Sequence, residues 1–271
     1  LIDSGIVSIK KELSNGQIRL FNFVDGANGV EEATLVDGSP IHHGTAIACV
    51  GAVTTNNRKS LASAASLNKP VQITMCRVSN EVDGSIDTVD VIDAMNWCVD
   101  HQDVRGGPSA INLSVNSDTP PTYNGSSVVQ AIAKAAAKQG DLFVNGAGNT
   151  NFQDESPASK NFRVLVGLND SIMRWDEGPG VGSNYGAFKA AAPAVAVPCL
   201  NGTTKKVLYG TGTSFAAPCW ASCISLLMSL DANLNAPQAD KIVFKSATVT
   251  AEGYHLPDLA AAVNEALALE P

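Results

Sequence analysis

Short runs of β-branched and other apolar residues alternate along the chain with segments of helical periodicity, and this alternation constrains the fold more than any other feature. Strands are expected at residues 1–6, 70–78, 109–115, 141–149 and 161–168. Helices are expected at residues 43–53, 85–101, 126–140, 214–230, 236–247 and 256–268. Because several strands are apolar throughout, the pattern predicts an α/β fold with a mostly parallel sheet and helices on both faces. Such sheets bind ligands at the carboxyl ends of their strands.

The 271 residues contain no internal repeat and no low-complexity linker. An α/β chain of this length often forms one unit with a large core, so we expect a single domain over residues 1–271. Residues 114–127 and 169–192 are rich in Gly, Pro, Ser and Asn, and we expect them to form surface loops.

Composition narrows the range of partners. Hydrophobic residues make up 45% of the chain and charged residues 16%, an ordinary globular balance, and no apolar run is expected to reach the ~18 residues that cross a membrane. The net charge of -8 disfavours nucleic acid, because phosphates would be repelled. We therefore expect neither a membrane nor a nucleic acid as a partner.

The six cysteines show no CxxC spacing of the kind that binds zinc or exchanges thiols. They are expected to be small buried hydrophobic residues. Their even number permits export of the protein, and buried thiols fit a reducing compartment equally well.

The stretch GTGTSFAAP at residues 210–218 places Ser214 at the expected start of a long apolar helix. A helix N-terminus carries unpaired N–H groups and a partial positive charge, which suits an oxyanion beside a nucleophilic hydroxyl. The preceding glycines leave that hydroxyl open to approach. Pro218 is expected near the first turn, where a missing N–H does least damage. The alternative is that Ser214 simply caps the helix.

Three other polar residues stand next to glycines in comparable positions. Asp3 follows an apolar pair and precedes a turn, His43 precedes Gly-Thr at a helix start, and Asn149 ends the sequence VNGAGN. Each also fits a structural role when taken alone, as a turn residue, a solvated histidine or an asparagine in a left-handed turn. His42 is expected to be a bystander.

The four residues occur in the order Asp, His, Asn, Ser, and the Asp, His, Ser order is the one found in subtilisin. LIDSGI, HHGTAIA, VNGAGN and GTSFAAP resemble the four motifs of the subtilisin-like serine proteases (subtilases, peptidase family S8). The resemblance extends along nearly the whole chain, and PSAINLSV is similar to the strand that lines the family's substrate cleft. It implies the three-layer subtilisin-like fold and a serine endopeptidase that acts on polypeptides.

By this resemblance, Ser214 attacks the scissile carbonyl, His43 takes and returns its proton, and Asp3 orients the imidazole. The Asn149 amide and the Ser214 N–H would hold the oxyanion. Substrate would lie as an added strand against the residues that border the family's cleft. In this sequence they are Ser114, Val115, Asn116, Gly146, Ala147 and Gly148.

The sequence departs from the family at several positions. Asn116 stands where glycine is usual, so we expect a narrower or more polar pocket that disfavours large aromatic side chains in the residue before the scissile bond. Ala46, Cys49 and Cys219 replace two histidines and a glycine but no catalytic group. The family's calcium loop corresponds to residues 54–65, which carry no carboxylate, so no calcium site is expected there and no cofactor is required.

Only two residues precede Asp3, although a strand has to hold it. We expect further residues upstream on a longer precursor, or a removed pro-segment or N-terminal fragment that remains bound. The expectation that the protein is exported rests on the family resemblance alone.

Three other functions are alternatives to a serine endopeptidase. A peptide ligase or macrocyclase would use the same acyl-enzyme, with an amine in place of water. A catalytically silent binding module would keep only the fold, which the intact set of four residues argues against. A dinucleotide-binding protein is disfavoured, because GTGTSF and NGAGNTN lack the third glycine of GxGxxG.

Overall fold

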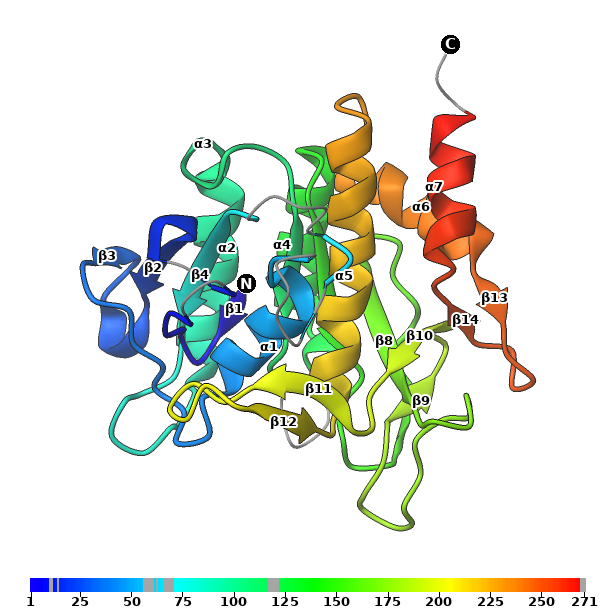
Figure 1. Ribbon diagram of the computed structural model, residues 1–271, viewed down its shortest axis with the longest axis horizontal. Helices are drawn as coiled ribbons and strands as arrows, with labels where there is room; N and C mark the ends of the chain where they lie inside the picture. The colour runs from blue at the N-terminus through cyan, green and yellow to red at the C-terminus, as the bar shows by residue number, and fades with distance from the viewer. Residues whose placement is uncertain are drawn as a thin grey trace. The chain divides into compact units, whose positions relative to one another are not determined.

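The computed structural model describes residues 1–9, 12–13, 15–55, 61, 63–65, 71–116 and 122–268. The chain divides into two compact units (Figure 1). The first comprises Leu1–Gly107 and Pro198–Gly210, and the second comprises Pro108–Val197 and Thr211–Pro271. Each unit combines parallel strands with helices, which confirms the expected α/β class.

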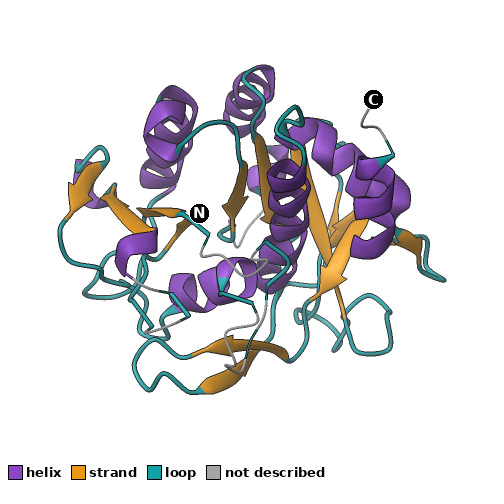
Figure 2. Cartoon of the chain, turned by 45° about the horizontal axis from the view of Figure 1, so that its top comes forward, coloured by secondary structure: helices purple, strands orange, loops and turns teal. Residues whose placement is uncertain are grey.

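The first unit contains a sheet in the order β1 (Ile2–Asp3), β4 (Ile73–Arg77), β2 (Ile18–Asn22) and β3 (Val30–Glu32). Neighbouring strands are parallel except for the antiparallel pair β2 and β3. Helices α1 (His43–Ala52) and α2 (Thr88–Asp100) both contact β1 and lie on either side of the sheet (Figures 1 and 2). Asp3 is the last residue of β1 and pairs in register with Arg77, the last residue of β4, so it lies at the carboxyl ends of both strands.

Smaller elements complete this unit. They are η1 (Asn15–Gln17), η2 (Val24–Gly26), α3 (Gln102–Arg105) and the paired strands β11 (Val197–Leu200), whose first residue belongs to the second unit, and β12 (Val207–Gly210).

The second unit contains the strands β5 (Ala110–Leu113), β6 (Leu142–Gly146), β8 (Phe162–Leu168), β10 (Ala190–Pro193) and β14 (His255–Leu256), in that order. All of these neighbours are parallel, and β13 (Thr248–Val249) adds an antiparallel edge to β14. Helix α5 (Thr213–Leu230) packs against β5, β6, β8 and β10, while α4 (Ser127–Lys138) covers the opposite face (Figure 2).

The remaining elements of the second unit are η3 (Tyr123–Gly125), α6 (Ala236–Ser246), α7 (Leu259–Leu267) and the two-stranded parallel sheet of β7 (Gln153–Asp154) and β9 (Tyr185–Gly186).

Helix boundaries follow from local capping. Asp87, Ser126 and Asp258 each accept a hydrogen bond from a backbone N–H in the first turn of the helix that follows. Asn235 and Gln238 form a reciprocal capping box at α6. Because these side chains satisfy N–H groups that have no helical partner, each helix begins within a few residues of its predicted start.

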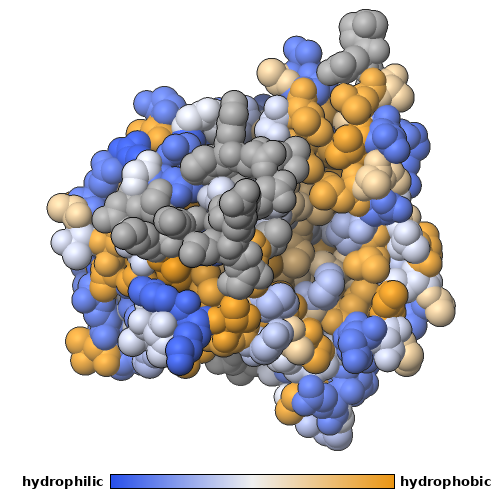
Figure 3. Space-filling model, in the orientation of Figure 1, coloured by the Kyte–Doolittle hydropathy of each residue, from blue (hydrophilic) through white to orange (hydrophobic). Residues whose placement is uncertain are grey.

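Helix α5 corrects one expectation from composition. Its 18 residues are long and apolar enough to cross a membrane, so the expectation that no run reaches this length was wrong. Within the structure 67% of the helix is buried, because it packs on four strands. The apolar side chains of α7 instead remain visible at the surface (Figure 3), where Leu267 is 50% exposed.

The expectation that residues 114–127 and 169–192 form surface loops was wrong in part. Residues 169–192 contain β9 and most of β10, and Ser183, Asn184 and Phe188 within them are buried. Alanine-rich β10 lacks the β-branched residues that mark a strand, but its small side chains fit beneath α5. Residues 117–121 of the other loop lie outside the described residues, while Tyr123 and Asn124 are buried.

A buried ion pair fixes α5 and α6 to the sheet. Asp240 of α6 accepts hydrogen bonds from the Trp220 indole N–H of α5 and the Arg163 guanidinium of β8, at 2.9 Å for the Trp220 Nε1 and Arg163 Nε contacts. The Asp240 side chain is only 4% exposed and that of Arg163 20%, so the carboxylate has little access to water that could replace these bonds. The pair therefore holds the helix that carries Ser214 in place.

We expect Asp240→Ala to lower the free energy of unfolding by about 3–5 kcal/mol, because it leaves a buried indole N–H and a half-buried guanidinium without their acceptor. Chemical denaturation measures this loss. Glu265→Ala, which removes the exposed ion pair with Lys245, is the control and should cost at most about 1 kcal/mol. Equal effects of the two substitutions would contradict the role given to Asp240.

Candidate functional site

The first unit places Asp3 and His43 in direct contact. Asp3, at the end of β1, is fully buried, and its Oδ1 lies 2.7 Å from Nδ1 of His43, the first residue of α1. The His43 side chain remains 23% exposed. The Ser4 backbone N–H donates to the same carboxylate oxygen at 2.7 Å. A buried carboxylate therefore holds an imidazole whose other edge can face a ligand.

Gly44 makes this contact possible. A Cβ at residue 44 would lie 2.1 Å from the Gly5 carbonyl oxygen and 3.1 Å from Asp3 Oδ1. Any larger residue would push the start of α1 away from β1. The glycine of the HGT sequence is thus required by the close approach of the helix to Asp3.

Asp37 and Ser4 cap α1 from outside the helix. Asp37 Oδ2 accepts from the backbone N–H and the hydroxyl of Thr45 at 2.9 and 2.7 Å, and its Oδ1 accepts from the Ser4 hydroxyl at 2.6 Å. The Ser4 hydroxyl in turn accepts from the Gly44 N–H at 2.8 Å. These bonds satisfy the first N–H groups of α1 and fix the helix that carries His43.

The surroundings raise the pKa values of His43 and Asp37. Burial lowers the pKa of the His43 imidazole, but the charge of Asp3 and its hydrogen bond, helped by the charge of Asp37, outweigh burial and raise this pKa above 6.5. Burial raises the pKa of the Asp37 carboxyl above 3.8, against the hydrogen bonds from Ser4 and Thr45 that lower it. The Asp3 contact thus favours the protonated imidazole.

We expect the His43 ring signals in an NMR titration to report a pKa above 6.5, and Asp3→Asn to lower that pKa by removing the charge that raises it. The Asp3–His43 ion pair contributes its full stabilisation of the folded protein below a pH of about 6.5, the pKa of histidine in the unfolded chain. This contribution is lost as the pH rises through the higher pKa that His43 has in the folded protein.

Glu31→Gln, at an exposed ion pair with Arg19, is the matched control and should leave the His43 titration unchanged. A His43 pKa at or below 6.5 in the parent protein would contradict the analysis.

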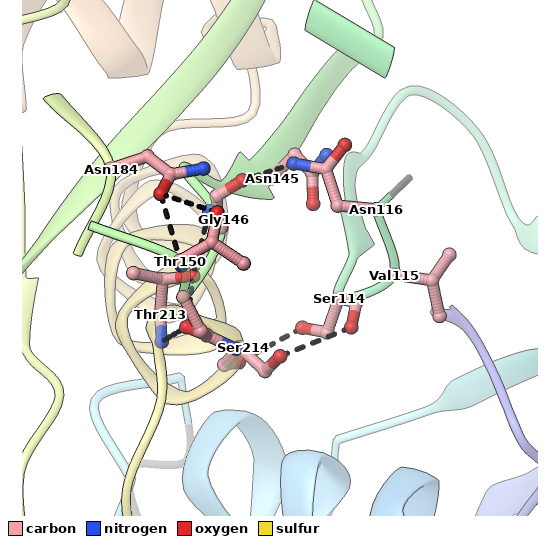
Figure 4. A pocket seen from close by; sticks show the side chains of 11 residues that line it. Ser114, Val115, Asn116, Asn145, Gly146, Thr150, Asn184, Thr213 and Ser214 are labelled. Atoms are coloured by element: carbon pink, nitrogen blue, oxygen red, sulfur yellow. Dashed lines mark hydrogen bonds between the residues drawn. The ribbon is translucent and has the colours of Figure 1, made fainter. Parts of the chain in front are cut away.

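The second unit places Ser214 as the second residue of α5. The Ser214 hydroxyl donates to the Ser114 carbonyl at 3.2 Å, and the Ser114 hydroxyl donates to the Ser214 carbonyl at 2.9 Å (Figure 4). The Asn112 amide donates to that Ser114 hydroxyl at 2.8 Å. Two reciprocal bonds therefore join the segment after β5 to the start of α5.

Pro218 explains why the Ser114 hydroxyl bonds the Ser214 carbonyl. The expectation that Pro218 lies near the first turn of the helix was wrong. It is the sixth residue of α5, inside the helix. In a continuous helix the N–H of residue 218 would donate to the Ser214 carbonyl, but proline has no N–H. The Ser114 hydroxyl fills this role instead.

Asn149 is exposed, and hydrogen bonds from Thr213 fix the orientation of its side-chain amide. Its Oδ1 accepts from the backbone N–H and the hydroxyl of Thr213 at 2.8 and 3.0 Å, and the Thr213 hydroxyl accepts from the Gly148 N–H at 3.0 Å. With Oδ1 engaged, Nδ2 is the end of this amide that can donate to a ligand.

A pocket surrounds Ser214 in the second unit. It is lined by residues 114–116, 145–146, 148–150, 184 and 213–214 (Figure 4). None of these described lining residues is charged, and most offer amide or hydroxyl groups. The pocket is therefore suited to a neutral, polar ligand such as an extended peptide.

Asn184 orders one wall of this pocket. Its Oδ1 accepts from the N–H and hydroxyl of Thr150 and from the Phe152 N–H, and its Nδ2 donates to the Ala147 carbonyl at 3.1 Å. Gly148 has φ +104, and a Cβ there would lie 2.4 Å from Asn184 Nδ2. Only glycine fits so close to this amide.

The predicted residues are thus distributed over both units. Asp3 and His43 are in contact in the first, while Ser214, Asn149 and most of the expected substrate-binding residues surround one pocket in the second. Ala147 is fully buried and does not line the pocket. His42 binds the Thr203 hydroxyl through Nε2 at 2.6 Å.

Sequence reasoning gave no role to several residues that build these arrangements. They are Ser4, Asp37, Asn145, Thr150, Asn184 and Thr213. Asn145 and Thr213 lie inside the motifs VNGAGN and GTSFAAP, so the signal was present without an assigned function. Asp37 and Asn184 act on residues remote in sequence, which no local pattern reveals.

All six cysteines are free thiols, five buried and Cys219 half-buried, which confirms the expectation of small buried side chains. Burial raises the pKa of Cys49 and of Cys219 to about 12. Thiols of such high pKa are poor nucleophiles near neutral pH. Within the described ranges no three His, Cys, Asp or Glu side chains gather in a way that could hold a metal ion. Half of the segment 54–65 discussed for calcium, residues 56–60 and 62, lies outside the described residues.

Residues 1–262 match the family model described as the subtilase family. The thermophilic serine proteinase of Bacillus sp. (strain AK1) is 28% identical over 241 residues, which cover 86% of this chain and 52% of that protein. Subtilisin-like protease 1 of Trichophyton equinum is 30% identical over 156 residues, which cover 55% of this chain and 28% of that protein. The chain spans about half the length of the first relative and less of the second.

A solved structure described as proteases from Pseudoalteromonas arctica PAMC 21717 is similar with a TM-score of 0.75 and 22% identity. The alignment covers 98% of this chain and 88% of that one. This likeness shows that the expected three-layer α/β fold is present.

Proposed function

Because the chain belongs to the subtilase family, we propose that it is a serine endopeptidase that cleaves peptide bonds through an acyl-enzyme. The observation that carries the proposal is the 2.7 Å contact between the buried Asp3 carboxylate and His43. A carboxylate in this position orients an imidazole and stabilises its protonated form, which is the state that general-base catalysis creates.

In the proposed reaction, Ser214 Oγ forms a bond to the scissile carbonyl carbon while its proton passes to His43 Nε2. The C–N bond then breaks, and His43 returns the proton to the leaving amine. Water releases the acyl group in the second half, with His43 again as the base. The raised pKa of His43 keeps the imidazolium stable between these proton transfers.

The oxyanion would be held by Asn149 Nδ2 and the Ser214 backbone N–H. The bonds from Thr213 to Asn149 Oδ1 support this role, because they fix the amide before substrate arrives. A donor held in advance stabilises a developing charge without reorganising during the reaction. The partial positive charge at the start of α5 acts in the same direction.

A polypeptide is the proposed substrate, with its backbone along residues 114–116. The uncharged, amide-rich lining of the pocket supports this, because peptide groups need donors and acceptors rather than ions. A pro-segment as a further partner, and one catalytic domain over residues 1–271, are part of the same proposal by family resemblance. The steps above use only groups of this chain, the substrate and water.

Labelling with a fluorophosphonate probe tests the nucleophile. We expect the intact mass of the protein to rise by one adduct, because the probe reacts with a serine hydroxyl activated by a neighbouring base. Ser214→Ala should abolish the adduct, whereas Ser222→Ala, at another serine of α5 whose hydroxyl bonds the Cys219 carbonyl, should retain it. A folded parent protein without an adduct would refute the proposal. Product masses from a peptide substrate then separate hydrolysis from peptide ligation.

Asn149→Ala tests the oxyanion site. It should reduce kcat by about 10²- to 10³-fold with little change in KM, a scale that comes from subtilisin, a member of the same family. The reason is that Nδ2 would bind the charged intermediate more strongly than the substrate carbonyl. Steady-state kinetics with one peptide substrate measure both constants, and an unchanged kcat would exclude Asn149 from this role.

A further inference from the structure

The pocket beside Ser214 is crossed by the side chain of Asn116. Its Nδ2 donates to the Gly146 carbonyl at 3.3 Å, and its Oδ1 accepts from the Tyr123 N–H at 3.0 Å (Figure 4). The bond to Gly146 is longer than the usual ~2.7–3.2 Å of N–H···O hydrogen bonds and is therefore a weak one. A substrate side chain that enters the pocket has to displace it.

Asn145 lies in the same pocket and carries an unused donor. The residue is only 1% exposed, and its Nδ2 has no hydrogen-bond partner among the described residues. Asn184, which also lines the pocket, has hydrogen bonds at both ends of its amide. A buried donor without a partner is unusual in folded proteins, and a ligand that supplies an acceptor accounts for it.

These groups define the chemistry of the side chain that fits. Displacing Asn116 from Gly146 releases one N–H donor and one carbonyl acceptor, and Asn145 adds a second donor. A carboxamide satisfies all three, because its oxygen accepts two hydrogen bonds and its NH₂ group donates. An aromatic or aliphatic side chain would leave them unpaired, and a carboxylate would be desolvated with no cation among the lining residues that the structure describes.

From these contacts we infer that Asn145, together with Asn116, selects substrates with glutamine or asparagine before the scissile bond. The inference rests on the proposed peptidase function and deepens it by naming the class of side chain recognised.

Two matched peptide pairs test the inference in the full chain. In each pair the peptides differ only before the scissile bond, with Gln against Met or Asn against Leu, which have similar shapes but differ in the amide. We expect kcat/KM to favour the amide member by about tenfold or more, the value of one or two hydrogen bonds. Asn145→Leu should reduce the ratio to about one.

The Asn145→Leu variant should fold, because an apolar side chain of similar size replaces an unpartnered polar group. Asn145→Ala serves as a second variant with the same expected loss of preference. Asn124→Ala is the matched control, since Asn124 is also a buried asparagine with an unpartnered amide atom but does not line the pocket. The control should keep the parent ratio.

Calorimetric binding of the same peptides to the Ser214→Ala variant provides a readout without turnover. The amide peptides should bind about tenfold more tightly, and Asn145→Leu in this background should remove the difference. Selective binding without a fluorophosphonate adduct on the parent would overturn the peptidase function and support the recognition.

An adduct together with equal ratios for all peptides would support the function and overturn the recognition. A parent preference for Phe or Met before the scissile bond, or an Asn145→Leu variant that keeps the preference for Gln, would also overturn the inference.

Discussion

The amino end of α5 is the constraint on which the pocket of the second unit depends. The start of a helix leaves N–H groups without partners, and here Asn149 Oδ1 accepts the hydrogen bond of the Thr213 N–H. In return, the Thr213 hydroxyl accepts a hydrogen bond from the Gly148 N–H in the turn after β6. The turn after β6 and the start of the helix are thereby tied together. Because α5 is buried against four strands, the core sets the position of Ser214.

The first unit solves the same problem at α1 with different groups. The cap residue His42 has a left-handed backbone and offers no side-chain cap, so Asp37 and Ser4 supply the acceptors. Their network ends one residue from the carboxylate that holds His43. Capping, which is a stability requirement, therefore also brings the imidazole to Asp3.

Local signals made much of this predictable. The strand and helix alternation gave the class of fold, and short glycine-containing motifs marked Asp3, His43, Asn149 and Ser214. Asn184 could not be found in this way, because its partners lie more than thirty residues away in sequence. Strand β10 was missed because three alanines and a proline carry no β-strand signal outside their packing.

The proline inside α5 has a consequence for how binding and chemistry relate. By leaving the Ser214 carbonyl without its helical donor, Pro218 lets the Ser114 hydroxyl take that carbonyl. One bond then joins the segment expected to bind substrate to the peptide unit of Ser214. The proposed substrate-binding segment and the proposed nucleophile are therefore positioned by the same hydrogen bonds, so a substitution at Ser114 would disturb both.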